Sequence, residues 1–222
     1  MFVLLAVAHP LPLHASLVLT NGEFTGNLNS WTASGMVFNT GDTGVFSDSV
    51  ASPTSLFQSG VVAGNLISVE LSFDIFNGLS PTIPDGFFPD SFFATLYFGS
   101  SAFGPALIGG NFDQAVVLYD LDASGPFNVA AGATFGTSPK GAGWTRYALT
   151  YQTSPGFTGP GYVTAAFEFY NLNGTASDSV VAIDNVTLNT VVPEPSQPLL
   201  ISLTTVGLLL RRSRNSCSMP LP

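Results

Sequence analysis

Residues 66–76 read LISVELSFDIF, in which apolar and polar side chains alternate from Val69 onward. Successive side chains of a β-strand point to opposite faces of its sheet, so this alternation predicts a strand with one buried face. The buried set is Val69, Leu71, Phe73 and Ile75, and the opposite set is Glu70, Ser72 and Asp74. A strand buried on one face is typical of an antiparallel sheet that packs against a second layer.

The same alternation recurs along most of the chain. Residues 162–170 place on one face Val163, Ala165, Phe167 and Phe169, and on the other Thr164, Ala166, Glu168 and Tyr170. Further runs, separated by clusters such as 77–84 and 138–143, predict strands at residues 16–20, 35–39, 54–62, 91–98, 115–121, 145–151 and 180–190. Nine or more such strands, with no helical periodicity between residues 16 and 190, predict an all-β fold: a two-sheet antiparallel β-sandwich.

Residues 181–188 read VAIDNVTL and contain a shift in the alternation. Val181 and Ile183 occupy odd positions, whereas Val186 and Leu188 occupy even ones. A strand buries both pairs on one face only if it contains an extra residue, so the sequence predicts a β-bulge near Asp184-Asn185.

Charge is unevenly distributed along the chain. There are 5 Lys and Arg against 14 Asp and Glu, and three of the basic residues fall within residues 211–214. Residues 16–190 keep only Lys140 and Arg146 against thirteen carboxylates, a net charge of −11. Such a surface repels phosphate backbones, which excludes nucleic acid as a partner and suits divalent cations or neutral sugars. The alternative is an ordinary solvated acidic surface.

Histidine and cysteine are confined to the two ends of the chain, at His9, His14 and Cys217. Residues 16–190 contain neither type. Their absence excludes Ser-His-Asp and Cys-His nucleophilic catalysis in this part of the chain, and also zinc held by His or Cys. Since no disulfide can form there, packing, with or without a metal ion, must stabilise the fold.

The N-terminal segment reads FVLLAVA at residues 2–8, followed by Pro10, Pro12 and a small-residue cleavage position after Ala15. It resembles the second half of a secretory signal peptide, which implies that residues 1–15 direct export. The segment has no basic region before its apolar run, and this leaves a start upstream of Met1 open. The alternative is a buried first strand, which the two prolines disfavour.

The C-terminal segment, residues 191–222, contains three features in a fixed order. They are the triplet Pro193, Glu194 and Pro195, an uncharged stretch at residues 197–210, and the arginines Arg211, Arg212 and Arg214. The uncharged stretch predicts an apolar helix with a rise of about 21 Å, shorter than the hydrocarbon core of about 30 Å. It is therefore expected to act as a temporary membrane stop with the arginines on the cytoplasmic side.

This order of features resembles the PEP-CTERM sorting signal of Gram-negative bacteria that produce exopolysaccharide. The resemblance implies that an exosortase recognises the Pro-Glu-Pro triplet. It also implies transient passage through the inner membrane, and delivery to the cell envelope, the cell surface or the extracellular matrix. Residues 215–222 depart from the pattern, in which the arginines stand near the end. A chance Pro-Glu-Pro before a plain membrane anchor is the alternative.

Short motifs open and close the body of the chain. Residues 19–26 read LTNGEFTG, residues 29–32 read NSWT, and residues 182–188 read AIDNVTL. These motifs resemble the first and last segments of galactose-binding-like jelly rolls, which include several families of carbohydrate-binding modules. The resemblance implies that residues 16–190 form one jelly-roll β-sandwich and that its partner is a glycan such as exopolysaccharide.

Many jelly rolls of this kind hold a structural calcium ion between the opening segment and the last strand. Calcium prefers oxygen ligands, and the resemblance implies Asp184, Glu23 and Asp48 as the ligands, although Thr25 stands where the family often has Glu. The alternative is that Asp184 accepts hydrogen bonds from the backbone at the bulge. Residues 120–125 imitate the start of an EF-hand loop but lack the acid at its twelfth position, so an acidic turn is expected there.

Aromatic side chains are the candidates for sugar contacts, because an aromatic face offers apolar and CH–π contact to a pyranose ring. Phe87 and Phe88 lie in the longest irregular stretch, residues 77–89, and Trp144 follows a Gly-rich loop. These three residues are the predicted ligand-binding residues. Trp31, which follows a turn, is expected in the core.

Together these features predict a non-catalytic exported protein of the envelope or extracellular matrix that binds or is embedded in exopolysaccharide. One alternative is a glycan-cleaving enzyme with two carboxylates, drawn from Glu70, Asp74 and Glu168 on the non-core faces of their strands. A retaining pair would stand about 5–5.5 Å apart and an inverting pair about 6.5–9.5 Å. The other alternative is a structural surface component that assembles through exposed sheet edges.

Overall fold

The computed structural model describes residues 14–47, 53–62, 66–84, 87–102, 114–130, 133–153, 161–174 and 178–192. The stretch Ala15–Val192 forms one compact unit. The predicted sorting motif, apolar stretch and arginine cluster lie outside the described residues, as do Asp48 and residues 1–13 of the predicted signal segment. Among the residues that the structure describes, no helix is long and apolar enough to cross a membrane.

The described residues form two sheets. The strands are β1 His14–Leu17, β2 Thr32–Ser34, β3 Val37–Asn39, β4 Gly44–Ser47, β5 Thr54–Val62, β6 Ser68–Gly78, β7 Ser91–Gly99, β8 Gln114–Asp122, β9 Gly125–Val129, β10 Ala133–Gly141, β11 Trp144–Gln152, β12 Gly161–Tyr170 and β13 Val180–Val192. One sheet has seven strands, in the order β10-β11-β6-β13-β4-β3 with β1 beside β13. The other has six, in the order β2-β5-β12-β7-β8-β9.

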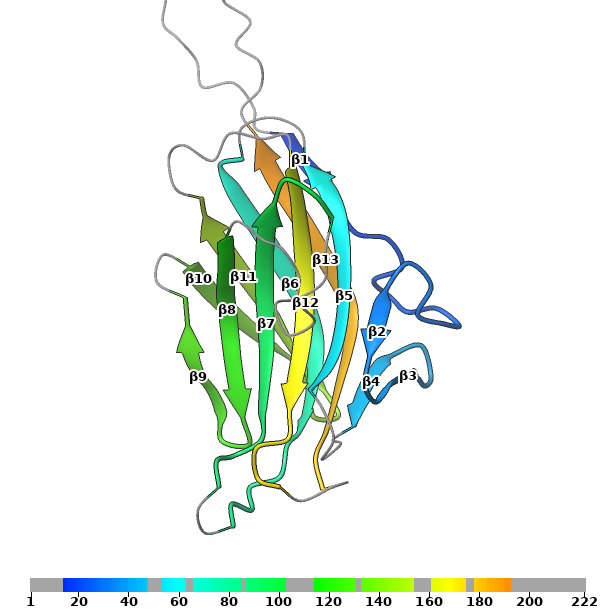
Figure 1. Ribbon diagram of the computed structural model, residues 1–222, viewed down its shortest axis with the longest axis vertical. Coiled ribbons are helices and arrows are strands. Elements are labelled where there is room, and N and C mark those ends of the chain that lie inside the picture. The colour runs from blue at the N-terminus through cyan, green and yellow to red at the C-terminus, as the bar shows by residue number, and fades with distance from the viewer. Residues whose placement is uncertain are drawn as a thin grey trace, which may run out of the picture. The chain divides into compact units, whose positions relative to one another are not determined.

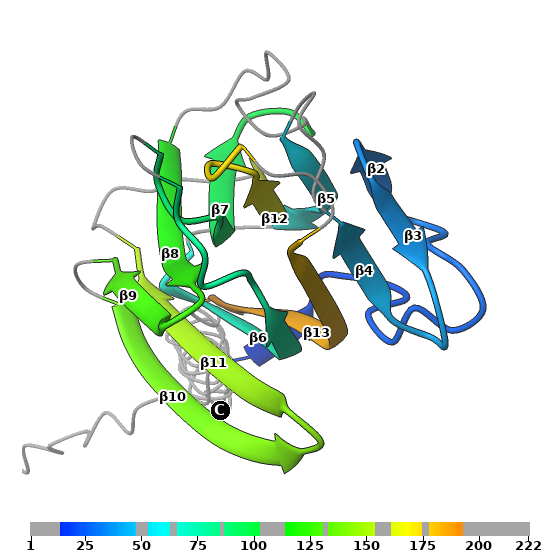
Figure 2. The ribbon, with the colours of Figure 1, turned by 90° about the horizontal axis from the view of Figure 1, so that it is seen from below.

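The two sheets lie face to face as the layers of a sandwich (Figures 1 and 2). Neighbouring strands run antiparallel in each pair whose register is described. This arrangement confirms the predicted all-β, two-sheet antiparallel β-sandwich.

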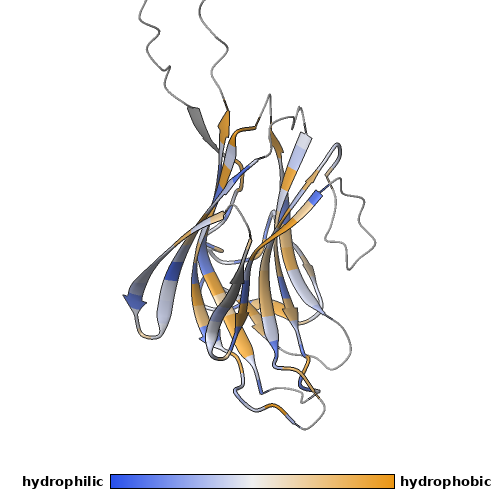
Figure 3. Cartoon of the chain, turned by 90° about the vertical axis from the view of Figure 1, so that its left-hand side faces the viewer, coloured by the Kyte–Doolittle hydropathy of each residue, from blue (hydrophilic) through white to orange (hydrophobic). Residues whose placement is uncertain are grey.

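The core consists of the inward faces that the alternation predicts. On β6 and β12 the buried side chains are Val69, Leu71, Phe73, Ile75, Val163, Ala165, Phe167 and Phe169. The Phe73 ring packs against both sheets. Its centroid lies 6.0 Å from the ring centroid of Tyr147 in its own sheet, and 5.9 and 5.1 Å from those of Tyr119 and Phe167 in the other sheet. Figure 3 shows the two layers from the side, with hydrophobic and hydrophilic residues alternating along the strands.

The predicted β-bulge is confirmed. The pairing of β13 with β6 shifts between Asp184 and Thr187, and Asn185 has a φ of 51°. The extra residue lets one strand bury both apolar pairs, and the buried side chains are Val181, Ile183, Val186 and Leu188. Asn tolerates this left-handed conformation better than most residues with a side chain.

The N-terminal segment passes over the bulge. The backbone N–H of Val186 donates to the carbonyl oxygen of Gly22 at 2.9 Å, and that of Val18 donates to Leu188 at 2.9 Å. Farther along, Phe24 and Trp31 are buried with their ring centroids 5.4 Å apart. Trp31 therefore belongs to the core, as the sequence predicts.

The sequence pattern misses the strands β2, β4, β9 and β10. Strand β10 is exposed along nearly its whole length, so its residues carry no buried alternation. Most of the cluster at residues 138–143, predicted as a connection, lies in this strand. The connecting turn is confined to Ala142 and Gly143, both with positive φ.

A substitution at Gly22 tests how strongly the stability of the fold depends on the passage of the N-terminal segment over the bulge. A Cβ atom at Gly22 would lie 1.9 Å from the carbonyl oxygen of Val186, so the N-terminal segment would have to leave the bulge. We expect Gly22→Ala to lower the free energy of unfolding by about 3 kcal/mol in urea denaturation, the upper range for overpacking.

Gly136→Ala is the matched control, because a Cβ there would meet its nearest neighbour, the carbonyl oxygen of Ala148, only at 4.0 Å. It should change the free energy of unfolding by less than about 1 kcal/mol. Equal losses in the two variants would contradict the role assigned to the crossing.

Candidate functional site

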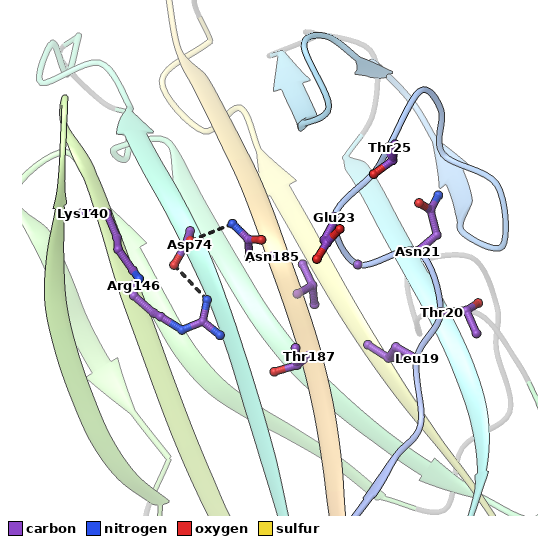
Figure 4. A pocket seen from close by; sticks show the side chains of 12 residues that line it. Leu19, Thr20, Asn21, Glu23, Thr25, Asp74, Lys140, Arg146, Asn185 and Thr187 are labelled. Carbon is purple, nitrogen blue, oxygen red and sulfur yellow. Dashed lines mark hydrogen bonds and ion pairs between the residues drawn. The ribbon is translucent and has the colours of Figure 1, made fainter.

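A polar cleft of about 670 Å³ lies on the outer face of the seven-stranded sheet, beside the bulge (Figure 4). Asp74 of β6 and Thr187 of β13 lie in it, Arg146 of β11 lies on one side, and the segment from Leu19 to Thr25 lies on the other. Its lining residues are Leu19, Thr20, Asn21, Gly22, Glu23, Thr25, Asp74, Lys140, Arg146, Asn185, Val186 and Thr187.

The polar side chains around Asp74 hydrogen-bond to one another. Asp74 accepts from Arg146 Nη1 at 3.0 Å and from Asn185 Nδ2 at 2.9 Å (dashed in Figure 4). Arg146 Nη2 also donates to Ser72 Oγ at 2.8 Å, and that hydroxyl lies 2.6 Å from Thr187 Oγ1. These contacts stabilise the bulge and leave the groups around Asp74 paired.

Asp184 takes part in the same network. Its Oδ1 accepts from the backbone N–H of Asn185 at 2.6 Å, and its Oδ2 accepts from Asn185 Nδ2 at 3.1 Å. Burial raises the pKa of Asp184 and the nearby charges of Asp74, Glu23 and Asp42 raise it further, while the backbone hydrogen bond opposes this. The predicted backbone role of Asp184 is therefore present in the structure.

The structure describes two of the three predicted calcium ligands. Asp184 and Glu23 belong to the same acidic neighbourhood, whereas Asp48 lies outside the described residues. No three His, Cys, Asp or Glu side chains of the described part gather as a metal-binding group. Calcium stays a prediction. The acidic turn expected at residues 120–125 is confirmed, since Asp122 Oδ1 accepts from the backbone N–H of Ser124 at 2.7 Å.

A second hollow, of about 450 Å³, lies on the outer face of the six-stranded sheet. Strands β7, β8 and β12 form it, because Glu168 stands opposite Phe93, and Thr95 opposite Val117, in the strand register. We call this hollow the apolar groove, and it is lined by Phe93, Thr95, Tyr97, Ala115, Val117, Glu168, Tyr170 and Leu172.

Three buried side-chain oxygens on this face are unpaired. Glu168 is 3% exposed and accepts from the Tyr97 hydroxyl at 3.1 Å through Oε2 only. Among the described residues, Glu168 Oε1, Thr95 Oγ1 and Asp120 Oδ1 have no hydrogen-bond partner. Asp120 stands opposite Phe93 on β8 and therefore shares this face. Unpaired buried oxygens are unfavourable, so these three are the atoms that a bound donor would satisfy.

The groove also changes the acidity of its side chains. Burial raises the pKa of Glu168, while the hydrogen bond from the Tyr97 hydroxyl favours the charged form and lowers it. Burial and then the charge of Asp122 raise the pKa of Asp120 to about 6, against a backbone hydrogen bond from Leu121. Burial, with a smaller effect of the Glu168 charge, raises the pKa of Tyr170. The groove is therefore a poorly hydrated surface with acidic groups in it.

The backbone of Phe88 is bonded to a residue of this groove, because its N–H donates to the carbonyl oxygen of Leu172 at 3.4 Å. Phe88 is 72% exposed and is not itself a lining residue. Phe87, 52% exposed, lies against Gly174. The fully buried Asp90 fixes the position of Leu172, since it accepts from the backbone N–H of that residue at 2.8 Å.

Trp144 lies on the other sheet, away from the apolar groove. It stands opposite Phe76 on β6, with ring centroids 6.1 Å apart, on the outer face of the seven-stranded sheet. The structure therefore does not bring Trp144 together with Phe87 and Phe88, which lie in the irregular segment before β7.

The carboxylates of the enzyme alternative do not form a pair. Glu168 lies on the outer face of one sheet, whereas Glu70 and Asp74 lie on the outer face of the other. Glu70 and Asp74 are four residues apart on one strand, so their Cα atoms are about 13 Å apart, and Asp74 is already paired with Arg146 at 3.0 Å. The sequence pattern did not identify Thr95, Tyr97 and Asp120 as candidate site residues. Thr95 and Tyr97 could have been found, because they alternate with the core positions of β7.

Comparisons with known proteins give only distant structural likenesses. No protein-family model matches this chain, and no curated protein matches it. The enzymatically active domain of bacteriophage CBA120 tailspike protein 4 is similar at 17% identity and a TM-score of 0.48, over 78% of this chain, which spans only 21% of that one. The module TmCBM61, solved with β-1,4-galactotriose, is similar at 14% identity and a TM-score of 0.41, over 78% of this chain and 97% of that one.

The mannan-recognising carbohydrate-binding module TmCBM27 is also similar, at 9% identity and a TM-score of 0.36, over 80% of this chain and 98% of that one. Two of these three structures are carbohydrate-binding modules. Likenesses at this level concern the sandwich alone and say nothing about what this chain binds.

The buried Glu168, with one oxygen unpaired, should destabilise the fold at neutral and higher pH. Its pKa is raised above the ordinary 4.5, so the folded protein holds the proton more tightly than the unfolded chain. Stability then falls as the pH rises from the unfolded to the folded pKa. We expect Glu168→Gln to raise the free energy of unfolding at pH 8 by on the order of 1 kcal/mol.

The gain should vanish below about pH 4, where the carboxyl is protonated in both states. Glu70→Gln is the control for lost negative charge, because Glu70 is exposed on β6. It should alter stability little across the same range. A loss of stability in Glu168→Gln at pH 8 would show that the charge is compensated in the fold.

Proposed function

We propose that this protein is a non-catalytic glycan-binding protein, exported and sorted by a PEP-CTERM signal, that binds exopolysaccharide through the apolar groove. The observation that carries the proposal is the set of unpaired buried oxygens, on Glu168, Thr95 and Asp120, beside the aromatic walls of that groove.

A sugar ring fits this combination of surfaces. Its apolar C–H face packs on aromatic rings, and Tyr170 and Phe93 stand in the groove with ring centroids 5.2 Å apart. Its hydroxyl groups donate hydrogen bonds, which carboxylate oxygens accept strongly.

Export and sorting rest on the two ends of the sequence. The apolar run before Ala15 supports export, and the order of Pro193-Glu194-Pro195, apolar stretch and arginines supports recognition by an exosortase. We place the mature protein at the envelope or in the extracellular matrix of a Gram-negative bacterium, after transient contact with the inner membrane.

Two aromatic substitutions distinguish the candidate faces. We expect Tyr170→Ala to weaken binding to a neutral polysaccharide at least tenfold, because it removes a wall of the groove. Trp144→Ala is the matched control on the opposite outer face and should leave binding unchanged. The measurement is isothermal titration against a galactan, a mannan, a β-glucan and purified bacterial exopolysaccharide.

The reverse pattern, with loss in Trp144→Ala only, would move the site to the other sheet. If none of these polysaccharides released heat with the unchanged protein, glycan binding itself would be wrong.

The sorting signal is tested separately. Replacing residues 193–195 with alanine in an exopolysaccharide-producing host should leave the tail attached, so the processed form of lower mass should disappear on mass spectrometry. The same form in the unchanged protein is the reference. Identical masses in the two strains would contradict processing at this triplet.

A further inference from the structure

We propose that the apolar groove selects glycans without anionic groups and rejects chains that carry uronic acid or other carboxylates. This inference rests on the proposed glycan binding and names the class of glycan that the groove takes.

Glu168 in the groove, and Asp120 on the same face opposite Phe93, each have an unpaired oxygen that a hydrogen-bond donor would satisfy. Glu168 Oε1 and Asp120 Oδ1 belong to carboxyl groups, which only accept hydrogen bonds when ionised. Thr95 Oγ1 either accepts or donates. A hydroxyl group of a neutral sugar satisfies a carboxylate oxygen, whereas a sugar carboxylate brings a second acceptor and a second negative charge. Two like charges close together in a poorly hydrated site repel strongly.

Within the described part of the chain, no basic side chain lies on this side of the sandwich. Lys140 and Arg146 are the only Lys or Arg between residues 16 and 190, and both line the polar cleft of the other sheet. Arg146 is already paired with Asp74 at 3.0 Å. Since the two sheets are about 10 Å apart, with the groove on the far outer face, neither cation can pair with an anionic group bound in the groove.

The groups around Glu168 are acidic or neutral on each packed element. Strand β7 offers the Tyr97 and Thr95 hydroxyls, β12 offers Tyr170, β8 offers Asp120 and Asp122 beyond it, and β5 offers Ser55 opposite Glu168. Protonation of Glu168 or Asp120 would remove the negative charge that accepts the sugar hydroxyl. Affinity for a neutral glycan should therefore fall on acidification, and the bias against anionic chains should weaken with it.

Matched polysaccharides test the selection. Affinity gel electrophoresis of the full protein would compare a galactan, a mannan and a β-glucan with the carboxymethylated form of each. We expect each neutral chain that binds at pH 8 and low salt to bind at least tenfold more tightly than its carboxymethylated form. The difference should shrink as salt is added and as the pH falls from 8 to 5.

Glu168→Gln supplies the internal check. It removes the charge but keeps the shape, so it should weaken neutral binding and narrow the preference for neutral chains. Glu70→Gln, on the other outer face, should preserve both. Equal affinity for neutral and carboxymethylated chains would overturn the selection while leaving glycan binding intact. Absence of binding to all of them would instead overturn the proposed function.

Discussion

The extra residue in β13 is the constraint on which the rest of this structure depends. With it, one strand buries Val181 and Ile183 before the bulge and Val186 and Leu188 after it. Without it, one of these pairs would point to solvent. The bulge also receives the N-terminal segment through Gly22 and carries Asn185, which bridges two carboxylates. The burial of β13, the position of the N-terminal segment and the polar network around Asn185 therefore all depend on this one bulge.

The two outer faces of the sandwich differ in how their polar groups are satisfied. Beside the bulge, Asp74 and Asn185 bond to one another, and Arg146 neutralises Asp74. In the apolar groove, Glu168 keeps one oxygen unpaired although it is almost fully buried. For stability alone, a neutral residue would be better at this position, because a buried carboxylate with an unpaired oxygen is unfavourable. Retention of such a group is the physical reason for assigning function to this face.

The sequence predicts the layers and the bulge because both follow from which residues are buried. It misses β10, whose exposed residues carry no alternation, and it misses the groove as a site. In the sequence, Glu168 and Thr95 are ordinary outward-facing strand positions. Only the register of β12 with β7 shows that they lie on the same outer face of the six-stranded sheet. The adjoining register of β7 with β8 also contains an irregularity between Ala94 and Thr95, which the alternation does not reveal.

Chemical-shift mapping with a neutral polysaccharide tests the central claim most directly, because it reports where on the isotope-labelled protein the glycan lies. The account predicts shifts confined to β7, β8 and β12, around Tyr97, Val117 and Glu168, with Lys140 and Arg146 unchanged. Shifts around Lys140 and Arg146, with the groove unchanged, would contradict it.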